Sequence, residues 1–178
     1  MHIKNVEFKA RVDQLGIYEN KLLLLGPVYQ GMDHQVDTYF NVPKGRLKLR
    51  EGTIENALIN YERENTSEAK KSDIILYKYP GNTALKDILT FQLGVKIIVD
   101  KKRKIYFLEN VKFHFDIVEN LGTFIEVEAI DTNSKYTSEA LKKQCDYYFG
   151  YFELNKSQLI EKSYSDLLEE SGNKPSQV

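Results

Sequence analysis

Strict alternation of apolar and polar residues marks several stretches of the chain as β-strands. In residues 4–12, Val6, Phe8, Ala10 and Val12 share one face, and polar or charged side chains occupy the other. This period of two is typical of a strand with one apolar face. The same pattern recurs in residues 46–50, 111–117 and 124–129. Residues 35–40, 57–63 and 72–79 are expected to be further strands, and residues 95–107 either one long strand or a tight hairpin. So many antiparallel strands predict a sheet that hides its edges, either by closing on itself or by pairing with a second sheet.

Helical spacing or helix boundary signals are found in residues 13–25, 83–93, 134–149 and 154–170. The first stretch is expected to be a loop and a short helix that stops at Gly26-Pro27, and the second stops at Gly94. Ser134 or Thr137 would provide the N-cap of the third. The fourth is expected to form one last, continuous helix.

No internal repeat and no interdomain linker interrupts this order of elements, so residues 1–170 are expected to form one α+β domain. A chain of 178 residues is long enough for one domain with a sizeable core. Residues 65–71 are polar and are expected to form a loop. Residues 171–178 have the composition of a disordered tail.

Charge and cysteine content narrow the classes of function. The formal net charge is −1, so the overall field of the protein gives no case for nucleic-acid or membrane binding. The single cysteine, Cys145, cannot form an internal disulfide or build a metal cluster. The longest aliphatic run, residues 22–25, is far too short to span a bilayer. These features favour a cytoplasmic protein with no nucleic-acid or membrane partner.

Charged residues recur at alternate positions on the polar faces of the strands. The sets are Glu7, Lys9 and Arg11; Lys48 and Arg50; Arg63; Lys101 and Arg103; and Glu126 and Glu128. If these faces point outward, the charges only keep the protein soluble, and for each strand taken separately this is the favoured interpretation. If they point inward, they surround a charged lumen. That lumen would need a bound ion or polyanion, because unpaired buried charges cost several kcal/mol each.

The hairpin predicted over residues 111–129 concentrates negative charge. Glu126 and Glu128 are two residues apart, so their side chains share a strand face, and Asp116 can face them from the other arm. Carboxylates gathered in this way repel one another unless a positive group lies among them, and a divalent metal ion is the economical candidate. An ordinary solvated face explains the hairpin alone equally well. His114, beside this cluster, fits a partnered packing residue.

Short motifs in almost the whole chain resemble the CYTH superfamily, also called the triphosphate tunnel metalloenzymes. The family signature E-x-E-x-K corresponds to Asn5-Val-Glu7-Phe-Lys9, with asparagine in place of the first glutamate. Further similar segments are residues 35–41, 45–51, 61–63, 70–73, 99–103, 116–122, 124–128 and 163–168. The form N-x-E-x-K-A-R is most similar to the class IV adenylate cyclase branch. No G-x-x-x-x-G-K-[ST] motif is present, so side chains would have to bind any phosphate.

This resemblance implies a closed eight-stranded antiparallel β-barrel that forms a tunnel, with helices packed outside and charged side chains inside. By the same resemblance, the triphosphate is bound by Lys9, Arg11, Lys48, Arg50, Arg63, Lys70, Lys101 and Arg103. Lys70 is the weakest of these candidates because the sequence places it in a loop. The resemblance further implies that Mg²⁺ or Mn²⁺ is held by Glu7, Asp116, Glu126 and Glu128, and that catalysis involves Glu7, Lys9, Arg63, Glu126 and Glu128.

The branch that the chain resembles implies adenylate cyclase chemistry, in which the 3′-hydroxyl of ATP attacks the α-phosphorus and pyrophosphate leaves. The alternative is a triphosphatase that hydrolyses thiamine triphosphate, inorganic tripolyphosphate or a nucleoside triphosphate, because the same tunnel serves both reactions. A third hypothesis is a non-catalytic triphosphate-binding module. The amide of Asn5 favours it by weakening one metal site. Family members often form dimers, so a homodimer is also open.

Overall fold

The computed structural model describes the backbone of residues 2–63, 70–81 and 84–172, and their side chains except those of residues 2–3, 63 and 70–73. The described strands are β1 (His2–Arg11), β2 (Val28–Phe40), β3 (Arg46–Gly52), β4 (Ala57–Arg63), β5 (Lys70–Lys78), β6 (Val95–Leu108), β7 (Val111–Val118) and β8 (Gly122–Asp131). The described helices are α1 (Leu15–Leu23), α2 (Leu85–Leu93), α3 (Ser138–Tyr151), α4 (Tyr164–Glu170) and a short 3₁₀ helix, η1 (Lys156–Gln158). None of these helices is both long and apolar enough to cross a membrane.

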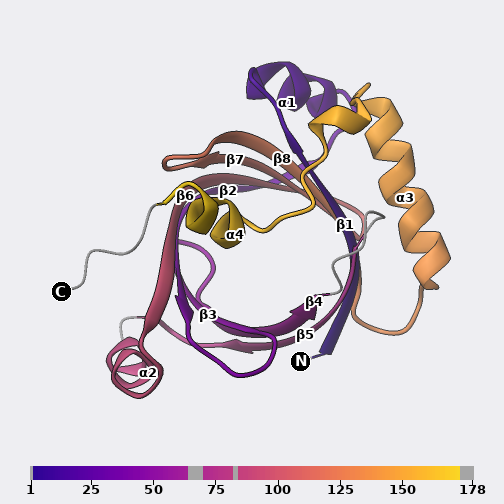
Figure 1. The fold of residues 1–178 in the computed structure, drawn as a ribbon. Helices are drawn as coiled ribbons and strands as arrows, with labels where there is room; N and C mark the ends of the chain where they lie inside the picture. Colours follow the sequence, from indigo (N-terminus) through magenta and orange to yellow (C-terminus); the bar gives the residue numbers. More distant parts are fainter. Residues whose placement is uncertain (1, 64–69, 82–83, 173–178) are drawn as a thin grey trace.

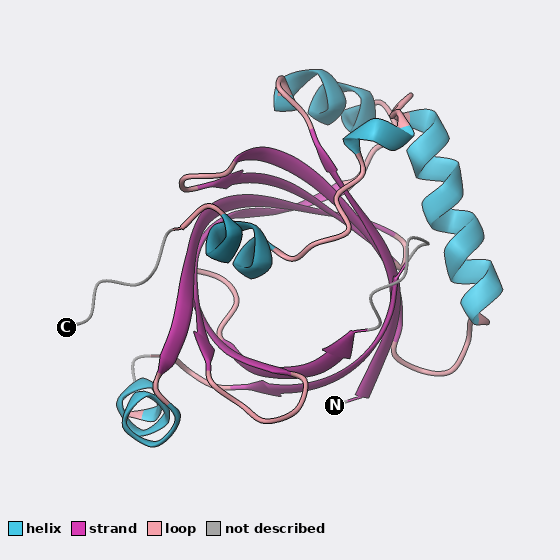
Figure 2. Ribbon diagram, viewed as in Figure 1, coloured by secondary structure: helices cyan, strands magenta, loops and turns pink. Residues whose placement is uncertain are grey.

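The eight strands form a ring in the order β1-β5-β4-β3-β2-β6-β7-β8, and every neighbouring pair is antiparallel (Figures 1 and 2). β1 pairs with β5 on one side and with β8 on the other, so hydrogen bonding continues around the ring. Inside it lies a cavity of about 540 Å³ that is partly open to solvent. The expected α+β class and the eight-stranded antiparallel barrel agree with the structure, in which strand pairing closes the ring and the tunnel inside it stays partly open to solvent.

The two faces of each strand have different surroundings, as the alternation predicts. On β1, Val6 and Ala10 point out of the ring and pack in one cluster with Phe113 of β7 and Cys145 of α3. Figure 1 shows α3 on the outside of this wall. The intervening residues of β1, including Lys9, line the cavity. The charged side chains in this lining therefore point inward, and for them the interpretation as solvated surface is wrong.

The helix α4 departs from the expectation that all helices pack outside. Its Tyr164 and Leu168 are buried in a cluster with Val99 of β6 and Phe124 of β8. Val99 is in phase with Lys101, which lines the cavity, so this cluster fills the inner side of the ring. The inner face of β6 changes from apolar to basic along its length, and α4 covers the apolar part. One end of the tunnel is thus plugged.

The single helix expected over residues 154–170 is interrupted. After η1, Leu159 forms a β-bridge with Ala10, and the N–H of Ile160 donates to the carbonyl of Lys9 at 2.8 Å. Backbone pairing with β1 therefore competes successfully with helix formation in this segment. Ser163 then starts α4 with a capping box.

Two strand boundaries differ from the expectation, and the first is that of β2, which begins at Val28 and not at residue 35. Strand β5 begins at Lys70 and not at residue 72, so the predicted loop is shorter at its C-terminal end. Of the two expected N-cap candidates, Thr137 is the N-cap of α3, and its hydroxyl accepts from the N–H of Ala140. The predicted disordered tail lies outside the described residues from position 173 onward.

Candidate functional site

The cavity is lined by many charged side chains beside apolar ones. Among the residues whose side chains are described, seven basic ones line it: Lys9, Lys48, Arg50, Lys78, Lys101, Arg103 and Lys112. Its five acidic residues are Glu7, Asp37, Glu55, Glu126 and Glu128. The lining thus carries an excess of positive charge, although the whole chain has a net charge of −1. An anion is the ligand that such a lumen attracts.

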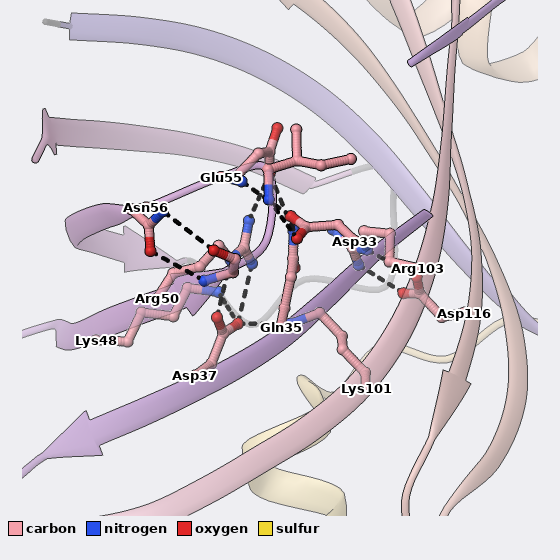
Figure 3. A network of polar contacts seen from close by, with 12 residues as sticks. Asp33, Gln35, Asp37, Lys48, Arg50, Glu55, Asn56, Lys101, Arg103 and Asp116 are labelled. Atoms are coloured by element: carbon pink, nitrogen blue, oxygen red, sulfur yellow. Dashed lines mark hydrogen bonds and ion pairs between the residues drawn. The ribbon is translucent and has the colours of Figure 1, made fainter. Parts of the chain in front are cut away.

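Asp37 of β2 is the centre of the densest part of this charge network (Figure 3). Its carboxylate accepts from Lys48 Nζ at 2.9 Å and from Lys101 Nζ at 2.7 Å. Arg50 donates to both of its oxygens, at 2.8 and 2.9 Å. Burial alone would raise the pKa of Asp37, but these three cations lower it well below its usual range. One buried carboxylate therefore faces three cations, which leaves positive charge available for a ligand.

Lys101 is the most deeply buried of these cations, with 2% of its surface exposed. Burial lowers the pKa of its ammonium group to about 7, although Asp37 opposes the shift. A second anion beside Lys101 would stabilise its protonated form. The cluster is therefore suited to accept negative charge close to neutral pH.

Arg103 links the carboxylates of the β7–β8 hairpin. Its guanidinium donates to both oxygens of Asp116, at 2.7 and 2.5 Å, and to Glu126 Oε2 at 2.7 Å. Tyr164 of α4 also donates to Asp116, at 2.8 Å. The positive group among these carboxylates is therefore an arginine. Asp116 is fully buried and is not part of the cavity lining, so the structure does not place it where the predicted metal ligand should be.

His114 lies between this hairpin cluster and Lys112 on the inner face of β7. Only 2% of its surface is exposed, and neither ring nitrogen has a hydrogen-bond partner among the described residues. Its Nδ1 is 3.6 Å from Glu126 Oε2. Burial and the nearby Arg103 lower the pKa of the imidazole to about 4. The ring is therefore buried as a packing residue is, with Glu126 as its charged neighbour, and it also lines the cavity.

Asn5, Glu7 and Glu128 bring oxygen atoms to the wall formed by β1 and β8. The Asn5 amide donates to Glu128 Oε1 at 2.6 Å, whereas its own buried Oδ1 has no hydrogen-bond partner in the described structure. Within the described part of the chain, no three His, Cys, Asp or Glu side chains are grouped closely enough to hold a metal ion. The donor set nevertheless fits one hard cation, because magnesium and manganese prefer oxygen ligands and an orphan amide oxygen can supply one.

The structure brings most of the sequence-predicted residues together in the lining: Glu7, Lys9, Lys48, Arg50, Lys101, Arg103, Glu126 and Glu128. Arg11 is not among them, because its side chain donates to the Leu121 carbonyl and lies over the ring of Phe124 at 4.7 Å. The side chains of Arg63 and Lys70 lie outside the described residues. Their backbones belong to β4 and β5, where Lys70 is paired in register with Glu7.

Several lining residues were not predicted. Asp37 was detectable, since it follows Asp33 and Gln35 at alternate positions of one strand. Lys112 shares the inner face of β7 with His114, which was a similar signal. Glu55 lies in the β3–β4 loop, where no periodicity marks it. β4 and β5 contribute an apolar wall of Ala57, Ile59, Ile74 and Leu76, which the alternation alone could not distinguish from ordinary core.

Comparison with known proteins gives a consistent result. Residues 4–164 match the CYTH domain. A protein of Methanocaldococcus jannaschii named "Putative adenylate cyclase" is 25% identical over 172 residues, which cover 91% of this chain and 97% of that protein. The structure of the PH1012 protein from Pyrococcus horikoshii superposes with a TM-score of 0.77 at 25% identity, covering 92% of this chain and 98% of the other. An X-ray structure from Vibrio parahaemolyticus, titled as a putative adenylate cyclase, gives 0.72 at 18% identity, with 93% and 97% covered.

Proposed function

Because the chain belongs to the CYTH family, we propose that it is a metal-dependent enzyme that processes a triphosphate compound inside the tunnel. The observation that carries this proposal is the arrangement around Asp37, where one buried carboxylate faces Lys48, Arg50 and Lys101. A triphosphate supplies the negative charge that such a cluster lacks. Charge-assisted hydrogen bonds from lysine and arginine are among the strongest contacts available to phosphate oxygens.

Within this class, adenylate cyclase activity is the preferred proposal. Two of the similar proteins carry that name. The apolar wall of β4 and β5 stands across the ring from the basic residues of β6 and β7, and it offers a surface for an organic group, which inorganic tripolyphosphate does not have. In the reaction, the 3′-oxygen of ATP forms a bond to the α-phosphorus. The bond from the α-phosphorus to the oxygen that bridges it to the β-phosphorus breaks. Pyrophosphate leaves with the electron pair, and the hydroxyl proton passes to solvent.

The proposed roles of the residues follow from their positions. Lys9, Lys48, Lys101 and Arg103 would bind phosphate oxygens and stabilise the charge that develops on the leaving pyrophosphate. Asp116 and Tyr164 would hold Arg103 in position, which replaces the metal-ligand role predicted for Asp116.

Asn5, Glu7, Glu126 and Glu128 would hold Mg²⁺ or Mn²⁺. That ion, when bound, supplies further neutralisation of phosphate charge and activation of the attacking hydroxyl.

Product analysis tests this proposal. Purified protein is incubated with ATP and Mg²⁺ or Mn²⁺, and phosphorus NMR follows the products. Cyclic AMP with pyrophosphate is the expected result. ADP with orthophosphate, or hydrolysis of only thiamine triphosphate or tripolyphosphate in parallel reactions, would replace the cyclase with a triphosphatase. Absence of turnover with every compound would contradict the enzymatic proposal.

A further inference from the structure

The β3–β4 loop, residues 53–56, is fixed at one end of the tunnel by a buried carboxylate. Asp33 of β2 is fully buried and accepts hydrogen bonds from the Thr53 hydroxyl at 2.9 Å and from the N–H groups of Ile54 and Glu55 at 2.8 and 3.1 Å. Asn56 closes the turn through two bonds to the backbone of Gly52, each 3.1 Å long. The loop is therefore held in a defined conformation.

Gly52 shows how closely the loop is packed onto its anchor. A Cβ atom at this position would lie 2.8 Å from one oxygen of Asp33 and 2.6 Å from the carbonyl of Glu55. A larger residue would displace either the loop or the carboxylate. The absence of a side chain at residue 52 thus permits the close approach that fixes Glu55.

This conformation directs the Glu55 carboxylate onto two cations of the lumen, of which Figure 3 labels Arg50. Lys112 Nζ donates to Glu55 Oε1 at 2.5 Å, and Arg50 Nη1 donates to Oε2 at 3.2 Å. Gln35 Nε2 also donates to Oε2, at 3.1 Å. Burial would raise the pKa of Glu55, but Lys112 and Arg50 lower it strongly, so the side chain is an anion. Glu55 therefore forms ion pairs with two cations that could otherwise bind a phosphate group.

The loop and the plug α4 lie at opposite ends of the tunnel. Arg46, the first residue of β3, donates to Asp166 of α4 at 2.8 Å, whereas Gly52, the last residue of β3, leads into the loop. Six residues of strand separate these ends by about 20 Å. Because α4 blocks one end, a phosphate chain bound at Lys48 and Lys101 can lengthen only toward Glu55.

We infer that Glu55 determines substrate specificity by limiting the number of phosphate groups that the tunnel can bind. Its carboxylate saturates Arg50 and Lys112 and repels a further phosphate, so the tunnel favours a triphosphate with an organic group over a longer inorganic polyphosphate. The apolar residues Ile54, Ala57 and Leu76 line the cavity near the same end and suit that organic group. This inference rests on the proposed function, because it requires the tunnel to bind triphosphate.

The test compares inorganic tripolyphosphate with inorganic tetraphosphate by isothermal titration calorimetry at constant excess Mg²⁺. The variant Glu55→Gln keeps the size of the side chain and removes its charge. Glu139→Gln serves as the control, since Glu139 carries the same charge on the outer helix α3, where it is 77% exposed. The expected wild-type result is that tetraphosphate binds no more tightly than tripolyphosphate. In Glu55→Gln, the ratio of the tetraphosphate affinity to the tripolyphosphate affinity should rise about tenfold, because one nearby negative charge has been removed.

The possible outcomes separate this inference from the proposed function. If both proteins bind tripolyphosphate but the ratio of the two affinities is unchanged in Glu55→Gln, the specificity role is refuted and the tunnel assignment stands. An equal change in Glu139→Gln would attribute the effect to overall charge and also refute the role. If neither the wild type nor Glu55→Gln binds tripolyphosphate, the proposed function fails, and this inference fails with it.

Discussion

Replacing Asp37 with asparagine removes the carboxylate that compensates three cations, of which Arg50 and Lys101 are buried and Lys48 is half-buried. Asp37 is 1% exposed, and its contacts with Lys48, Arg50 and Lys101 are all 2.7 to 2.9 Å long. Removing one partner of a buried ion pair typically costs about 3–5 kcal/mol, because the remaining charge stays buried and uncompensated. For a domain of this size, each kcal/mol lowers the melting temperature by roughly 2–4 °C. Asp37→Asn should therefore melt about 6–20 °C below the wild type.

Thermal unfolding followed by circular dichroism, with and without saturating tripolyphosphate, measures this effect. The ligand should raise the melting temperature of Asp37→Asn more than that of the wild type, since its negative charge replaces the missing carboxylate. Asp146→Asn is the matched control, because Asp146 forms an exposed ion pair with Lys142 on α3. Such a pair contributes less than about 1 kcal/mol.

Two results would refute this reasoning. The first is an Asp37→Asn protein whose free energy of unfolding lies within about 1 kcal/mol of the wild-type value, well below the cost expected for a broken buried pair. The second is a tripolyphosphate-induced shift that is the same in both proteins. Either result would mean that the cations around Asp37 are not the positive charge that a ligand neutralises.

Three further predictions address individual residues. Glu128→Gln should reduce metal-dependent turnover by at least about 100-fold while tripolyphosphate still binds, and full turnover would remove Glu128 from the metal ligands. Lys9→Met should raise the Kd for tripolyphosphate about tenfold in calorimetry, whereas Arg11→Met should not, because the Arg11 side chain lies outside the cavity lining. Since the pKa of Lys101 is lowered to about 7, its charged form is lost as pH rises through 7. The pH dependence that comes from titration of tripolyphosphate itself is the same in both proteins and is subtracted. The remaining affinity should then fall above pH 7 in the wild type but not in Lys101→Met.

The strand pattern was predictable because the ring has one apolar and one charged face. Alternation located β1, β3, β4, β6, β7 and β8 almost to the residue, and the motifs indicated that the charged faces point inward. Local periodicity could not reveal that α4 enters the tunnel end. Its Tyr164 contacts residues distant in the chain, such as Phe124. The break before α4 was missed for the same reason, since Ile160 is paired with β1.

The site residues on strands were predictable from their spacing. The roles that depend on contacts with residues of other strands or loops were less predictable. Lys101 and Arg103 were found from their spacing. That Arg103 bridges Asp116 and Glu126 depends on β6 lying beside β7, which the spacing within one strand does not encode. Glu55 was missed because loop residues have no periodicity, and its position depends on the distant Asp33.

The most direct test of the central claim is a calorimetric titration of the protein with tripolyphosphate, in parallel with the double variant Lys48→Met/Lys101→Met. Both lysines point into the tunnel and share Asp37, so their removal affects the proposed phosphate site while the outer surface stays unchanged. We predict one binding site per chain in the wild type and a loss of affinity of at least about 100-fold in the variant, from two charge-assisted contacts. Absence of binding by the wild type, or equal affinity in both proteins, would contradict a triphosphate site in this tunnel.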